Sequence, residues 1–99
     1  MSLNVKTIAS AQGVGSSAAV RMDTTPHMAK DSGVAVIQPA AGSDRNWALE
    51  KSVDDGATWT AVLSGSGAAL KIAEVQMAEQ MRLTVSGGTA GTVDALVMA

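Results

Sequence analysis

The sequence has no cysteine, phenylalanine or tyrosine, and Trp47 and Trp59 are its only aromatic residues among 99. The absence of cysteine excludes disulfides, zinc–thiolate sites and thiol chemistry, and it fits a reducing compartment. The core must therefore consist of Val, Leu, Ile and Met with two tryptophans, each a major contributor at about 25 cal/mol per Å² of buried apolar area. A core this light is marginal alone, and burial against neighbouring subunits would stabilise it.

Basic residues are also few. The net charge of −2 and the pI of about 5.1 give no electrostatic reason to expect nucleic acid or an anionic membrane as a partner. Residues 1–6 lack the basic cluster and apolar run of a signal peptide, so we expect none. No apolar run approaches the ~20 residues that span a bilayer. The length predicts one domain, 1–99.

What the chain does contain is a series of short apolar runs separated by Gly, Ser, Asp and Pro clusters. Alternation and β-branched residues predict about eight short strands at 8–12-residue spacing. This pattern favours an all-β, antiparallel β-sandwich or jelly roll. The expected strands cover 3–8, 18–22, 33–38, 46–52, 58–63, 70–72, 81–85 and 92–98.

Three segments between these strands carry further expectations. Residues 23–32 are expected to form an irregular connection, so that 1–32 comprises an N-terminal strand followed by an irregular segment. Residues 73–81 contain helix formers; a strand to Ile72 followed by a turn-like crossover is favoured over a short helix. Residues 64–67 are predicted to be a loop, and 87–91 a hairpin loop.

The sharpest local pattern is Ser-x-Asp-x-Gly-x-Thr-Trp at Ser52–Trp59. Its predicted role is a structural hairpin: an Asp side chain can accept turn N–H groups, and Gly can take positive φ. Trp59 is expected to begin the returning strand as a core residue. Trp47 is likewise expected in the core, because Leu49 shares its face of an alternating strand. The structural hairpin residues are Ser52, Asp54, Gly56, Thr58 and Trp59.

The sequence offers only weak candidates for groups of residues that act in catalysis or bind a ligand. Gly13–Ser17 lacks the Lys and the strand–helix context of a phosphate loop. His27 is the single histidine, and no nucleophile elbow accompanies it, so neither a catalytic triad nor a His-rich metal site is indicated. Asp54–Asp55 offer a thin ligand set for Ca²⁺, and Glu74 and Glu79 form no glycosidase pair. We therefore expect no enzyme activity and no catalytic, metal-binding or cofactor-binding residues.

The Ser52–Trp59 pattern resembles the Asp-box, which occurs on hairpin turns of sialidase-type propellers and other β-proteins, away from their active sites. A sialidase needs several blades, which 99 residues cannot supply. From Val34 to Val97 the layout resembles small bacteriophage virion proteins, namely capsid decoration (cement) proteins and neck or tail components. The resemblance rests on the Asp-box-like hairpin and on the segments 81–85, 87–91 and 92–96. It implies no catalytic residues.

This resemblance implies a virion structural protein of the phage head. Such a protein would be made in the host cytoplasm, sit on the capsid surface as a homo-oligomer, expected to be a trimer, and bind the major capsid protein or another virion protein. Residues 1–32 are the candidate contact arm. The alternative is a carbohydrate-binding or adhesion module of a larger surface assembly, which would need Trp47 or Trp59 exposed. A small enzyme is the least favoured hypothesis.

Overall fold

The computed structural model of the chain describes residues 4–22 and 32–99, which fold as a β-sandwich of two antiparallel sheets. No helix occurs in these described residues, so they contain no helix that is long and apolar enough to cross a membrane. The predicted all-β sandwich is confirmed. Its strands are β1 (Val5–Gln12), β2 (Gly15–Ser16), β3 (Val20–Arg21), β4 (Ser32–Pro39), β5 (Asn46–Ser52), β6 (Thr60–Ser66), β7 (Lys71–Gln76), β8 (Gln80–Ser86) and β9 (Val93–Met98).

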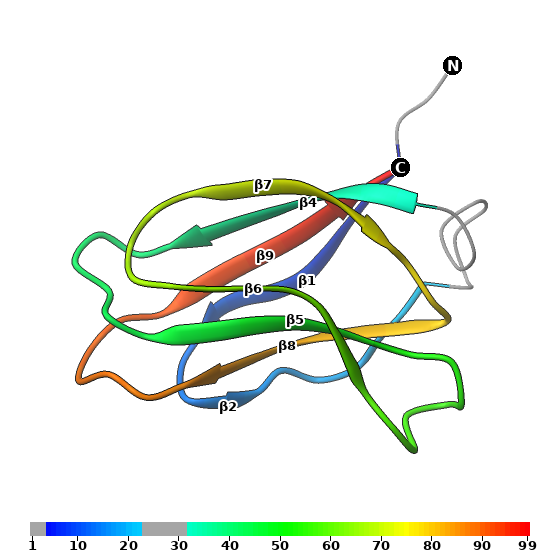
Figure 1. Cartoon of the computed structure of the whole chain (residues 1–99), viewed down its shortest axis with the longest axis horizontal. Helices are drawn as coiled ribbons and strands as arrows, with labels where there is room; N and C mark the ends of the chain where they lie inside the picture. The colour runs from blue at the N-terminus through cyan, green and yellow to red at the C-terminus, as the bar shows by residue number, and fades with distance from the viewer. Residues whose placement is uncertain (1–3, 23–31) are drawn as a thin grey trace.

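The strands pair in a nested order. Sheet A runs β1-β9-β4-β7, and sheet B runs β2-β8-β5-β6, with β3 also paired to β8. If β2 and β3 are counted as one interrupted strand, the first strand pairs with the last, the second with the second last, and so on to the β5–β6 hairpin. This rolled-up order is that of a jelly roll. The hairpin turn lies at one end of the molecule, and the connections 40–45 and 87–92 lie at the other (Figure 1).

The core lies between the two sheets. Side chains alternate between the faces of a strand, so Val93, Ala95 and Val97 of β9 point inward and are at most 2% exposed. Trp47 and Leu49 of β5 are buried opposite them in the same core, so the expectation that Trp47 belongs to the core is confirmed. The remaining core positions are Ile8, Ala9, Met22, Ala35, Ile37, Val75, Met77, Met81, Leu83 and Val85.

The first strand is longer than expected and irregular. Its pairing with β9 shifts register between Thr7 and Ala9 and again between Ala9 and Gln12. The first shift leaves two successive residues, Ile8 and Ala9, both buried. A bulge of this kind turns two successive side chains to one side.

Three loop expectations were wrong. Residues 64–66 belong to β6, where Ser66 pairs with Asn46. Residues 73–76 continue β7 and form neither a crossover nor a helix. Within them, Val75 pairs with Gly33 of β4 and is buried in the core. Residues 87–91 do not close a hairpin, since β8 and β9 lie in different sheets.

Several expectations fall outside the described residues. These include Leu3 of the first predicted strand, His27 and nearly all of the irregular connection 23–32. The hypothesis that residues 1–32 form a contact arm stays a prediction. Residues 5–12 are a strand of sheet A that contributes Ile8 and Ala9 to the core. Deleting residues 1–12 would therefore remove part of the fold.

Candidate functional surface

The Ser52–Trp59 pattern forms a closed turn between β5 and β6. The Ala57 N–H donates to the Asp54 carbonyl (3.3 Å), and the two residues between them have positive φ, 60° at Asp55 and 88° at Gly56. Positive φ at both central positions is what a tight type I′ hairpin turn requires. The Ser52 hydroxyl accepts the Gly56 N–H and donates to Asp54 Oδ1, both at 2.8 Å.

Asp54 completes this turn with its carboxylate. Oδ1 also accepts the Thr58 N–H at 2.9 Å, and Oδ2 accepts the Thr58 hydroxyl. The hydroxyl and N–H of Thr58, with the Ser52 hydroxyl, lower the pKa of Asp54 to about 2. The carboxylate thus accepts hydrogen bonds from residues on both sides of its own turn, and these bonds stabilise the turn.

Asp55 points the other way and ties the turn to sheet B. Its carboxylate Oδ1 accepts hydrogen bonds from Arg21 (2.8 Å) and from the Gln80 side-chain amide (2.6 Å). Arg21 lies on β3 and Gln80 on β8, so the turn is joined to two strands that precede and follow it in the chain. The ion pair with Arg21 is solvent-exposed and contributes little to stability.

The expectation that Trp59 is a core residue was wrong. The side chain is only partly buried and lies outside the core cluster, and the Arg82 guanidinium stacks 4.3 Å from its ring centroid. Arg82 Nε also donates to Glu50 Oε1 at 2.8 Å. Burial raises the pKa of Glu50, but hydrogen bonds from Thr84 and Arg82 outweigh it and hold that pKa below its ordinary value. Trp59 therefore belongs to a polar cluster on the outside of sheet B.

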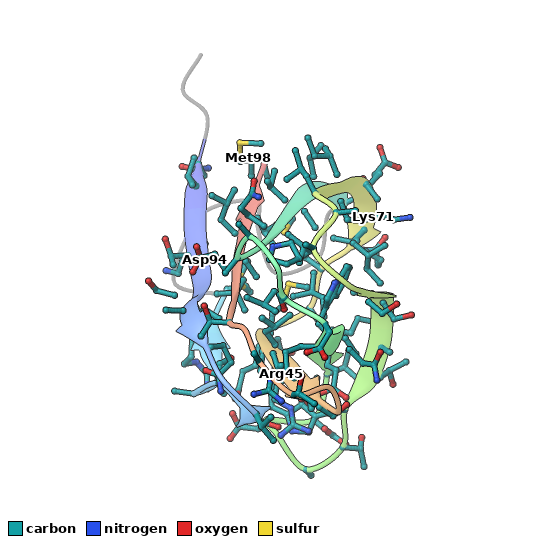
Figure 2. All side chains as sticks on the ribbon, turned by 90° about the vertical axis from the view of Figure 1, so that its left-hand side faces the viewer. Arg45, Lys71, Asp94 and Met98 are labelled. Atoms are coloured by element: carbon teal, nitrogen blue, oxygen red, sulfur yellow. The ribbon has the colours of Figure 1, made fainter. Side chains whose placement is uncertain are left out.

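The glycine-rich loop 87–91 is held by the β4–β5 connection. The Asp44 carboxylate accepts the N–H groups of Thr89 (2.8 Å) and Ala90 (3.0 Å) and the Thr89 hydroxyl. These three donors lower the pKa of Asp44 to about 2, the Ala90 N–H most. Arg45, beneath the loop in Figure 2, donates to the carbonyl of Gly87 at 2.8 Å. The anion-binding position that this loop offers is thus occupied by the chain's own carboxylate.

The two outer faces of the sandwich differ in chemistry. The outer face of sheet B is polar: Asn46 pairs with Ser66 and Ser86, and Ala48 pairs with Ser64 and Thr84. A shallow depression lies over these residues. Hydroxyl and amide groups here can face water without cost, as expected for the solvated side of an antiparallel sheet.

The outer face of sheet A is apolar, and we call it the sheet A face. One cross-strand row contains Val5, Met98 and Val34 and ends at Glu74; the next contains Thr7, Leu96, Val36 and Ile72. Ile72 is 59% exposed, Val5 54% and Val34 37%. Figure 2 shows Met98 and Asp94 along β9 on this face, with Lys71 across the sheet on β7. A small, mostly apolar notch lies beside the β1 bulge, between Thr7, Val36 and Leu96.

The sequence analysis missed this face, although a signal was present. A strand with one solvated face alternates, whereas a strand covered on both faces reads as a continuous apolar run. Residues 33–37 (GVAVI) and 95–98 (ALVM) are such runs. By contrast, β8 alternates in residues 81–86 (MRLTVS). Continuous apolar runs in β4 and β9 are therefore the sequence signal that the outer face of sheet A is apolar as well as its inner face.

Comparison with known proteins identifies no relative. No protein-family model, curated protein or solved structure matches the chain.

Proposed function

We propose that this chain is a structural protein of a bacteriophage particle, which decorates and stabilises the capsid by binding the major capsid protein lattice as an oligomer. In this role it has no catalytic site, acts without a cofactor, and sits on the outside of the head after synthesis in the host cytoplasm. Its partners are other virion proteins, and nucleic acid and membrane are not among them.

The observation that carries the proposal is the sheet A face. A contiguous apolar surface rimmed by polar residues marks a protein–protein contact on a soluble domain. Glu74 and Asp94 lie at its rim and are the acidic groups among its outward-facing residues. Within the described residues, no three His, Cys, Asp or Glu side chains gather to hold a metal ion. The surface is suited to binding a protein more than to chemistry on a small molecule.

Two further features favour a virion role over other binding roles. The jelly-roll strand order is common in viral capsid proteins, although lectin domains and cupins share it. The segments that resemble virion proteins in sequence are the β5–β6 turn (52–59) and the stretch from β8 of sheet B through its connection to β9 of sheet A (81–96). An oligomer on a repeating lattice gains avidity, so each contact can be weak.

The proposal is tested by mixing the purified protein with shells assembled from the major capsid protein of the phage that encodes it. We expect the protein to co-sediment with the shells and to raise the temperature at which they break open. An unrelated acidic protein of similar size serves as the control for trapping in the pellet. If the protein stays out of the pellet at concentrations well above the dissociation constants of ordinary protein–protein contacts, the proposal is contradicted.

A second candidate, a carbohydrate-binding or adhesion module, is favoured by one observation. Trp59 is partly exposed, and the nearby depression on sheet B is lined by Ser, Thr and Asn groups that could donate to sugar hydroxyls. Arg82 already covers a face of the Trp59 ring, however, which leaves less of it for stacking. A glycan that binds the chain on an array and changes the fluorescence of Trp59 in solution would support this reading over the first.

A further inference from the structure

Within residues 4–22 and 32–99 no segment covers the sheet A face, although β4 and β9 carry the continuous apolar runs of strands covered on both sides. Val34 and Val36 of β4, and Leu96 and Met98 of β9, point outward from strands whose inward positions fill the core. We propose that a second copy of this chain covers the face, so that two molecules pair sheet A against sheet A. The proposal rests on the proposed function only in taking the chain to be an assembly protein, and it specifies how the oligomer is built.

The edges of sheet A are unsuited to the pairing of copies strand to strand. Its edge strands are β1 and β7. β1 carries two register shifts and Lys6, and β7 carries Lys71 in the pairing position opposite Ile37. Bulges and lysines on edge strands are the features that prevent edge-to-edge association in native sheets.

Sheet B is protected in the same way. Its β6 edge has a register shift opposite Leu49 and Glu50, and its other edge consists of the two-residue strands β2 and β3. Very short strands and bulges both interrupt an edge as a template for another chain. Pairing strand to strand is therefore disfavoured at the edges of both sheets, and we place the contact between copies on the apolar face.

The size of the face fits a modest dimer. Ile72, Val5 and Val34 are 59%, 54% and 37% exposed. With the partly buried residues of the two rows they present on the order of 400 Å² of apolar surface, comparable to the largest patch on a typical monomer. Two such patches supply about 800 Å², so their polar rims must supply the rest of the about 1,200 Å² at the lower end of specific interfaces. A dimer in the micromolar range of dissociation constants is therefore expected.

The placement of charge permits a second copy to fit. Glu74 lies on the edge strand β7, and Asp94 lies a full row beyond Leu96 on β9. The Asp94 carboxylate also accepts the Ala11 N–H. Both acidic groups thus stand at the margin of the apolar rows, where they can stay hydrated. Pairing two copies through the centre of the face buries Val36 and Leu96 and leaves each carboxylate in water.

Sedimentation velocity of the full chain tests the inference over a concentration range from about 1 to about 500 µM, which brackets micromolar dissociation constants. We expect the mass to rise from 9.9 kDa to twice that value. Ile72→Glu should weaken the dimer by a factor of about 100 or more, because it places a charge inside a desolvated contact. Ser64→Glu, on the polar outer face of sheet B, should change the dissociation constant by less than about threefold.

Trp47 fluorescence reports whether each variant is folded, since Trp47 is 4% exposed in the core. Should Ile72→Glu fail to fold, Ile72→Thr replaces it, because Thr keeps strand preference while removing most apolar contact. A wild-type chain that stays monomeric over the whole range would overturn the inference. So would a trimer or larger species, or a dimer that Ile72 substitutions leave unchanged.

Shell binding is measured separately, so the two proposals fail separately. A chain that dimerises through the sheet A face but never joins the shell pellet upholds the inference and contradicts the capsid role. A chain that joins the pellet but is monomeric at all concentrations upholds binding to the capsid, without the oligomer, and overturns the inference.

Discussion

At the residue scale, the polar side chains of this domain act mainly on its own backbone. Asp54 accepts the N–H and hydroxyl of Thr58, and Asp44 accepts the N–H groups of Thr89 and Ala90. Each carboxylate fixes one connection, the β5–β6 turn in one case and the β8–β9 loop in the other. Such short polar residues serve turns well because their oxygens replace backbone hydrogen-bond partners.

These two carboxylates make the fold sensitive to acid. Both have a folded-state pKa of about 2 against an ordinary value of 3.8. A depressed pKa stabilises the fold above pH 3.8, and that stabilisation is lost as the pH falls through about 2. Asp44→Asn and Asp54→Asn should each lower the urea midpoint near neutral pH and make it fall less steeply between about pH 4 and pH 2.

Tryptophan fluorescence in urea at several pH values measures this effect. Asp54 belongs to the β5–β6 turn and Asp44 to the 40–45 connection, and these segments lie at opposite ends of the molecule (Figure 1), so the double variant should show the sum of the two changes. If the double variant loses stability in acid as steeply as the wild type, these carboxylates do not carry the effect.

The sequence was informative about these residues where the chemistry is local. The turn at Asp54–Gly56 follows from side-chain acceptors and positive φ within eight residues. Asp44 was missed, because its partners Thr89 and Ala90 lie 45 and 46 positions away. Trp59 was misassigned for a similar reason: Arg82, which stacks on it, comes from a strand that only the fold brings near.

At the element scale, the strand order explains which boundaries the sequence could predict. Strands 33–38, 46–52, 81–85 and 92–98 were predicted nearly at their observed positions, since each has strong alternation or a β-branched run. The end of β6 and the second half of β7 were missed, because Ser64–Ser66 and Ala73–Gln76 have weak strand propensity. Their places are set by pairing with β5 and β4 in the folded molecule.

The contact of β6 with β5 gives a prediction at this scale. A Cβ added at Gly65 would come within 2.6 Å of the Trp47 ring. Gly65→Ala should therefore destabilise the fold by about 1–3 kcal/mol, because the buried indole must shift. Gly13 has no atom within 4 Å of an added Cβ, so the control Gly13→Ala should change stability by less than about 0.5 kcal/mol.

Urea unfolding of both variants measures the difference. Equal stability of Gly65→Ala and Gly13→Ala would mean that Trp47 does not pack tightly against β6.

At the scale of the whole molecule, the sandwich has one polar and one apolar outer face. The polar face of sheet B has the Asp44 and Asp54 contacts at its ends. The sheet A face leaves Ile72, Val5 and Val34 in water in the single chain. The light core predicted from the sparse aromatic content is consistent with a domain that gains stability by assembling. Self-pairing would present two identical copies of the remaining surface to a repeating lattice, which multiplies weak contacts.

The most direct test of the capsid role is the number of copies bound per shell as the protein is titrated onto assembled shells. A decoration protein occupies equivalent lattice positions, so binding should saturate at a fixed ratio of copies to capsid subunits. Ile72→Glu should reach that ratio only at higher concentration, because avidity is lost. Binding that is absent, or that rises in proportion to concentration without saturating, would contradict the account.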